Sequence, residues 1–205
     1  GAERVLEQLL LIYPQAEIFT VIDKIPKGER NFLLNKKTKT SILQKLPFVK
    51  KYYRYLLPLM PLCIKFLNLK KYNLIISSSH AVAKGISKKK NQLHICYIHT
   101  PMRYAWDLRD QYLVEMGYSY GLRHKLISII LDKLKVWDLK TSRSVDFFIA
   151  NSKFIGERVK NAYNRNSVII YPPVNTSDFK IKTNKENFYL TASRLVPYKK
   201  IDIIV

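Results

Sequence analysis

The stretch ICYIHTPMRYAWDL, from Ile95 to Leu108, carries the strongest fold signal in the chain. An apolar run typical of a buried strand stops at His99, and Pro101 prevents it from continuing regularly. Turns usually take small residues such as Gly, Asn, Asp and Ser. Here the strand is followed by hydrogen-bonding and aromatic side chains instead. We therefore predict a buried strand followed by a loop whose side chains bind a ligand.

Similar short apolar runs recur along the chain, separated by helical patterns. The predicted strands are Glu17–Ile22, Asn73–Ser77, Leu93–Ile98, Val145–Ala150 and Val168–Tyr171. They are mostly apolar throughout rather than alternating, which is typical of parallel strands covered on both faces. Three predicted helices lie between or beside these strands: one that ends at Pro14, a long one from about Arg123 to Ser144, and one capped by Ser152. The pattern predicts an α/β fold, a Rossmann-like doubly wound parallel sheet.

Composition divides the chain into three regions. We expect an N-terminal Rossmann-like domain over residues 1–171, a polar, proline-led linker over 172–186, and the start of a second Rossmann-like domain over 187–205. Asn187–Ala192 is predicted as the first strand of that second domain, and the basic stretch Asp23–Thr40 as a loop. Because Gly1 directly precedes a helix and the chain stops where another helix starts, we expect a fragment that lacks its first strand.

The chain is strongly basic, with 36 Lys and Arg against 15 Asp and Glu and a formal net charge of +21. Such a charge suits nucleic acid, an anionic membrane surface or phosphorylated substrates. A bias in base composition accounts for it equally well without any polyanion. In Lys45–Lys71, cations alternate with apolar and aromatic residues, and this pattern predicts peripheral membrane association.

The two cysteines, Cys63 and Cys96, do not suggest a disulfide framework. The N-terminal residues read as an amphipathic helix rather than a signal peptide, and no apolar run reaches the roughly 20 residues that a membrane span needs. We therefore expect a cytoplasmic protein. Because the chain is strongly basic, we also expect peripheral attachment at the inner face of the plasma membrane.

Candidate site residues follow from one rule: in an open α/β sheet, ligands bind beyond the carboxyl ends of the strands. The loops after the predicted strands, together with the start of the first helix, supply His99, Arg103, Asp107, His80, Arg194, Lys199 and Gly1. Arg194 and Lys199 bracket a turn before a presumed helix N-terminus, where two cations and the helix dipole suit a diphosphate.

Two other chemistries find little support in the sequence. His94 and His99 are five positions apart on an extended chain, so their side chains point to opposite faces, and we predict no metal site. There is no Gly-x-Ser-x-Gly nucleophile motif. Cys96 lies in a predicted buried strand, where a thiol behaves as a small apolar group.

Six segments, in order and covering nearly the whole chain, resemble the retaining GT-B glycosyltransferases that use nucleotide-sugar donors. The resemblance is strongest to bacterial mannosyltransferase-like members of surface-polysaccharide synthesis. The segments are GAERVLEQLL at the start, ISSSHAVAKG from Ile76, CYIHTPMRYAWDL from Cys96, FIANSKFIGERV from Phe148, VIIYPPVN from Val168 and SRLVPYKKID from Ser193. The family implies two Rossmann-like domains that face each other across a cleft, with the acceptor mostly on the first and the donor on the second.

The resemblance also implies roles for individual residues. Arg194 and Lys199 look like the pair that grips the donor diphosphate, and His99 like the histidine that reaches the donor sugar. Gly1 resembles the glycine that lets a loop approach the donor phosphates. Pro172, Pro173 and Val174 resemble the hinge. The implied donor is GDP-mannose or another nucleotide sugar, the acceptor is a saccharide or lipid-linked saccharide, and no divalent metal is required.

The chain departs from the family at three points. Only one glycine, Gly1, is visible in the first loop, and Lys200 stands where many members have glycine. The glutamate pair of the second domain would lie beyond Val205, so we expect this fragment to be inactive alone. Two alternatives stay open: a catalytically inactive GT-B relative, and a basic nucleic-acid-binding protein. The second alternative is weakened because the basic and aromatic residues, as in Lys50–Arg54, are scattered without a binding motif.

Overall fold

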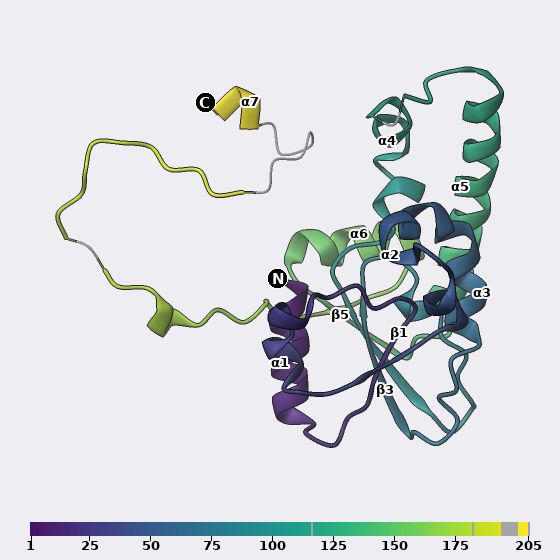
Figure 1. The fold of residues 1–205 in the computed structure, drawn as a ribbon, viewed down its shortest axis with the longest axis horizontal. Helices are drawn as coiled ribbons and strands as arrows, with labels where there is room; N and C mark the ends of the chain where they lie inside the picture. The colour runs from purple at the N-terminus through teal and green to yellow at the C-terminus, as the bar shows by residue number, and fades with distance from the viewer. Residues whose placement is uncertain (116, 182, 194–200, 205) are drawn as a thin grey trace.

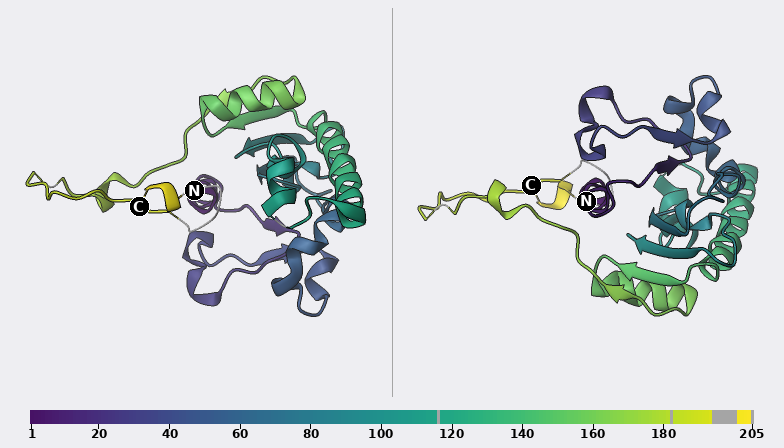
Figure 2. Two further views of the ribbon diagram at one scale, coloured as in Figure 1. Left: turned by 90° about the horizontal axis from the view of Figure 1, so that it is seen from above. Right: turned by 90° about the horizontal axis from the view of Figure 1, so that it is seen from below.

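The chain is an α/β protein with two parallel sheets (Figure 1). A computed structural model describes residues 1–115, 117–181, 183–193 and 201–204. Helices lie on both sides of the larger sheet, with α1 (Ala2–Ile12) on one side and α5 (Gly121–Ser142) on the other (Figure 2). The predicted α/β class with a parallel sheet is confirmed.

The larger sheet has four strands in the order β3-β4-β5-β6, all parallel. Their bounds are Leu74–Ser79, Leu93–Ile98, Phe147–Ala150 and Val168–Ile169. The bounds predicted for β4 are confirmed; β3 runs two residues further than predicted, and β6 is shorter. The register pairs Ser79 with Ile98 and Ile98 with Ala150, so three strands end level. This alignment brings the loops after β3, β4 and β5 to one edge.

The smaller sheet pairs β1 (Ile18–Thr20) with β2 (Thr38–Thr40) in parallel. The prediction that the whole of Asp23–Thr40 is loop is wrong at its end, because the last three residues form β2. TKT is too short and polar to read as a strand by itself. It becomes one because β1 lies beside it, and the Ser41 backbone N–H donates to the Thr20 carbonyl at 3.2 Å.

Prolines and N-cap residues in the sequence mark several boundaries of the remaining helices. Pieces broken by prolines form α2 (Val49–Tyr52), the 3₁₀ helix η4 (Tyr53–Leu59) and α3 (Met60–Lys65). After β4 come the 3₁₀ turn η6 (Arg103–Ala105), α4 (Arg109–Glu115) and the long α5. The predicted N-cap of α6 (Lys153–Tyr163) is confirmed, because the Ser152 hydroxyl accepts a hydrogen bond from the Ile155 N–H at 3.2 Å.

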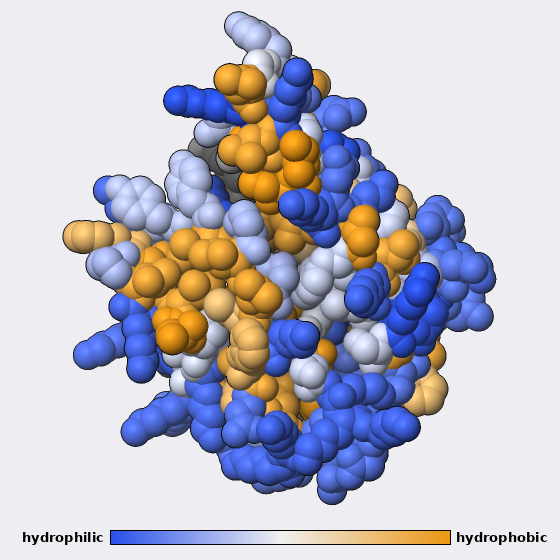
Figure 3. Space-filling model, turned by 90° about the vertical axis from the view of Figure 1, so that its right-hand side faces the viewer, coloured by the Kyte–Doolittle hydropathy of each residue, from blue (hydrophilic) through white to orange (hydrophobic). Residues whose placement is uncertain are grey.

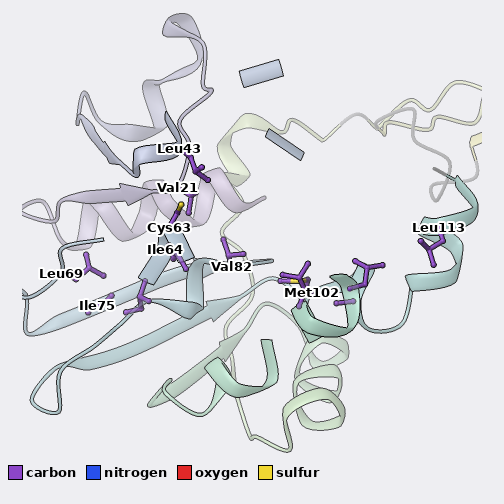
Figure 4. Close-up of a cluster of buried hydrophobic side chains, with 13 residues drawn as sticks. Val21, Leu43, Cys63, Ile64, Leu69, Ile75, Val82, Met102 and Leu113 are labelled. Carbon is purple, nitrogen blue, oxygen red and sulfur yellow. The ribbon is translucent and has the colours of Figure 1, made fainter. Parts of the chain in front are cut away.

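Within the part of the chain that the structure describes, two apolar clusters form the core. One joins the loop and helix layer around α3, η6 and α5, and Figure 4 shows its side chains, including Cys63, Ile75 and Met102. The other packs α6 on the sheet through Cys96, Phe148 and neighbouring residues. Burial of this apolar surface supplies the main drive for folding. The first cluster includes Met102 and Ala105 from the segment after β4, and the second includes Ile98 and Ala150 at the ends of β4 and β5.

The C-terminal residues differ from the expectation. Asn187–Ala192 forms no strand, and it runs in an exposed segment that leaves the folded body (Figure 1). A strand needs a neighbouring strand to satisfy its backbone groups, and none pairs with this segment within the described residues. The short helix α7 (Ile201–Ile204) follows. None of the helices in the described ranges is long and apolar enough to cross a membrane.

Candidate functional site

The level strand ends bring three polar residues together at the carboxyl edge of the sheet. His80 follows β3, His99 follows β4 and Asn151 follows β5. The backbone continues this alignment, because the His99 N–H donates to the Ser79 carbonyl at 2.8 Å. The Asn151 Nδ2 donates to the His99 carbonyl at 3.3 Å. Hydrogen bonds therefore connect the ends of these three strands at the carboxyl edge of the sheet.

The imidazole of His99 is held in a defined orientation. Its Nε2 lies 2.8 Å from the Ser78 hydroxyl, and its ring lies 5.2 Å from the Tyr97 ring, centroid to centroid. Burial lowers the pKa of His99, and the neighbouring His80 lowers it further. The imidazole is therefore mostly neutral at pH 7, and a neutral ring can donate at one nitrogen and accept at the other.

The titratable groups of the same rim influence one another's pKa. Desolvation lowers the pKa of His80, and the nearby Arg103 guanidinium lowers it further. A backbone hydrogen bond at the start of α1 lowers the pKa of Glu3, and His99 contributes in the same direction. Four of these side chains thus share one electrostatic environment: His80, His99, Arg103 and Glu3. Sequence reasoning picked out the first three of them, and Gly1 lies at the same end of α1.

Asp107 is directed elsewhere. Its Oδ2 forms an ion pair with Arg158 on α6, which ties the loop after β4 to that helix. Trp106 also serves the scaffold, because its Nε1 donates to Asp138 Oδ2 at 2.9 Å and its ring packs edge-on to Tyr163 at 5.9 Å. These contacts make Asp107 and Trp106 supports of the loop rather than groups that reach out from its tip.

A buried polar cluster lies beneath this loop. Lys84 and Asp138 form an ion pair in which each side chain is only 1% exposed. The Lys84 ammonium also donates to the Asp138 carbonyl at 3.0 Å and to Thr141 Oγ1 at 3.3 Å. The Tyr163 hydroxyl donates to Asp138 Oδ2 at 2.7 Å. The cluster joins the segment after β3, the loop after β4, α5 and α6, and sequence reasoning missed it.

A hollow of about 520 Å³ lies beside the rim, between the start of α1 and the 3₁₀ turns Lys27–Glu29 and Asn31–Leu33. It is lined by Gly1, Glu3, Arg4, Glu7, Glu29, Asn31 and Phe32. The histidines are not among these lining residues. Gly1 has open space around it, because a Cβ built there would meet nothing within 4 Å.

The described residues contain no group of three or more His, Cys, Asp or Glu side chains that could hold a metal ion. His94 is fully buried with its Nε2 2.8 Å from the Ser77 hydroxyl. Burial raises the pKa of the Cys96 thiol to about 12, which leaves it protonated and unreactive. Arg194 and Lys199, the proposed diphosphate pair, lie outside the described residues, as does Lys200.

Three contributors to the site were not singled out from the sequence: Ser78, Asn151 and Glu3. The rule that found His80 and His99 also points to Asn151, since it directly follows β5. Comparisons with protein-family models, with curated proteins and with solved structures found no match. The fold and site therefore define the chain at the level of class: an α/β protein with parallel sheets and a polar, histidine-bearing carboxyl edge.

Proposed function

We propose that this chain is the acceptor-side half of a retaining GT-B glycosyltransferase that moves a hexose, mannose by preference, from a nucleoside diphosphate sugar to a saccharide or lipid-linked acceptor. The observation that carries the proposal is the oriented, partly buried His99 at the carboxyl edge, braced by Ser78 and Asn151. Ligands of open α/β sheets bind at this edge. A sugar offers hydroxyl groups, which neutral imidazole and amide groups can recognise.

In the proposed mechanism, the departing diphosphate is bound by the second domain, which begins with the segment that contains Arg194 and Lys199. The bond between the anomeric carbon and the diphosphate breaks, and the acceptor oxygen forms its bond on the same face. The acceptor proton leaves with the departing phosphate oxygen. Arg194 and Lys199 meet the charge that develops on the diphosphate, and preorganised cations of this kind lower the barrier strongly. His99 holds a sugar hydroxyl near the reacting carbon.

The test compares two histidine substitutions in the two-domain protein that this proposal implies. His99→Ala should lower turnover by about 100-fold, the lower end of the loss seen when one preorganised hydrogen-bonding group is removed from an active site. His124→Ala is the matched control, because His124 lies on α5 with its Nδ1 2.8 Å from the Tyr118 carbonyl. It should leave turnover unchanged. The assay follows release of nucleoside diphosphate from GDP-mannose and other nucleotide sugars.

Melting temperatures of both variants separate loss of catalysis from loss of folding. Unchanged turnover of a folded His99→Ala protein would remove the proposal. Activity that vanished with a chelator and returned with magnesium would contradict the assignment of the leaving-group charge to Arg194 and Lys199. No transfer from any nucleotide sugar by that two-domain protein would favour an inactive relative of the family.

A further inference from the structure

The segment from η3 to α3 carries apolar side chains on its exposed side as well as on its buried side. Val49, Cys63 and Ile64 face the core. A second set of apolar side chains recurs every three or four positions along the same segment and is exposed to solvent. This exposed stripe consists of Phe48, Tyr52, Tyr55, Leu59, Leu62 and Phe66.

The members of the exposed stripe are well exposed, with Phe48 at 77% and Phe66 at 79%. The rings of Tyr52 and Tyr55 lie 6.3 Å apart, so neighbouring members lie side by side. Figure 3 faces the side of the molecule that carries α3 and α5, and it shows apolar side chains gathered in patches bordered by hydrophilic ones. Large contiguous apolar patches on a protein surface mark contact sites.

The basic charge around the exposed stripe indicates which partner binds this surface. No Asp or Glu occurs in residues 30–106. Basic residues border the exposed stripe on the same helical segment: Lys45, Lys50, Lys51, Arg54 and Lys65. All five are exposed. An apolar and aromatic stripe beside a row of lysines is the pattern of segments that lie in the interface of an anionic membrane.

A second copy of the chain fits this surface less well. Two copies meeting through the exposed stripe would bring their basic borders together without any acidic partner from the same segment, and like charges repel. Another row of exposed apolar residues, Leu122, Leu126 and Ile129 on α5, is also flanked by basic residues, but it has the acidic Asp132 close by in sequence, whereas the exposed stripe has no acidic neighbour in sequence. The exposed stripe is therefore the surface whose charge complements anionic lipid.

We propose that the exposed stripe and its basic border form a docking surface for an anionic phospholipid membrane. Phe48, Leu62 and Phe66 enter the interface, and the lysines contact lipid phosphates. Aromatic and leucine side chains gain free energy when they leave water. The proposal rests on this surface alone, so it stands or falls independently of the glycosyltransferase assignment.

The experiment measures cosedimentation of the chain with vesicles of phosphatidylcholine alone and with vesicles that also contain phosphatidylglycerol. The wild-type chain should bind the second kind at least about tenfold more tightly, because each lysine near an anionic surface contributes about 1 kcal/mol, or about fivefold. Lys50→Gln/Lys51→Gln should weaken binding by about 25-fold. The matched control Lys89→Gln/Lys90→Gln removes the same charge from exposed positions outside the segment and should have a smaller effect.

The apolar part is tested by Phe48→Ser/Phe66→Ser, which should weaken binding at least about tenfold. The matched control is Phe179→Ser/Phe188→Ser, the same change at two other exposed positions. Absence of binding to the phosphatidylglycerol vesicles overturns the proposal, as does equal loss in the two phenylalanine pairs. A wild-type dimer that Phe66→Ser converts to a monomer, seen by light scattering, also overturns it and assigns the surface to a second copy.

Discussion

Replacing Lys84 with methionine should destabilise the chain more than any change to its surface charges. Methionine keeps most of the volume of the lysine stem, so the substitution removes the ammonium group and leaves the Asp138 carboxylate without its cation. Both side chains are 1% exposed, and water cannot compensate for the loss. Removing one partner of a buried ion pair costs about 3–5 kcal/mol. This is a large part of the 5–15 kcal/mol that stabilises a typical domain.

Urea denaturation followed by far-ultraviolet circular dichroism measures this loss. With a slope of about 2 kcal/mol per molar urea, the midpoint should fall by about 2 M. Lys88→Met is the matched control, because Lys88 pairs with Asp146 at a more open position, where its side chain is 18% exposed. A partly exposed pair contributes about 1 kcal/mol or less.

The double variant Lys84→Met/Asp138→Asn sharpens the test. Asparagine removes the unpaired charge and retains an oxygen that can accept from Trp106 Nε1 and the Tyr163 hydroxyl. It should recover part of the lost stability relative to Lys84→Met alone. If Lys84→Met costs no more than Lys88→Met, the reasoning that burial sets the magnitude is refuted.

Three further outcomes are expected. Burial lowers the pKa of His94 from 6.5 to about 4, and the nearby Lys88 and Lys84 also lower it. Between pH 4 and pH 6.5, the imidazole of His94 is therefore protonated in the unfolded chain but not in the folded chain. Stability should therefore rise by about 3 kcal/mol from pH 4 to pH 6.5, and His94→Gln should flatten that rise in urea titrations at each pH. Gly85→Ala places a methyl group against the Trp137 indole and should cost about 1–3 kcal/mol in urea midpoints, whereas Gly28→Ala meets open space and should be nearly neutral. Ser152→Ala removes the cap of α6 and should cost about 1 kcal/mol, seen as a lower melting temperature.

Much of the fold was predictable because its signals are local. The apolar run Leu93–Ile98 predicted β4 at its observed bounds, and Ser152 predicted the start of α6. The order of apolar strands and helices predicted parallel pairing, and the rule for strand ends led to His80 and His99. β2 escaped prediction because its three residues form a strand only beside β1.

Part of the site was less predictable, because its contacts join distant positions. Asp107 was a candidate site residue, and the sequence did not indicate that its carboxylate pairs with Arg158 on α6. Asn151 was passed over although it follows a predicted strand. The roles of Arg194 and Lys199 remain predictions, since both lie outside the described residues.

By itself, the sequence determined the α/β class, the positions of the main strands and the polar residues that follow them. Hydrophobic periodicity and capping act over a few residues, so they can be recognised without coordinates. Only the tertiary structure decided which of these residues meet: His99 with Ser78, Lys84 with Asp138 across 54 positions, and the exposed stripe left uncovered on α2, η4 and α3. Such contacts depend on how strands align and which helix faces are buried, and those are properties of the packed chain as a whole.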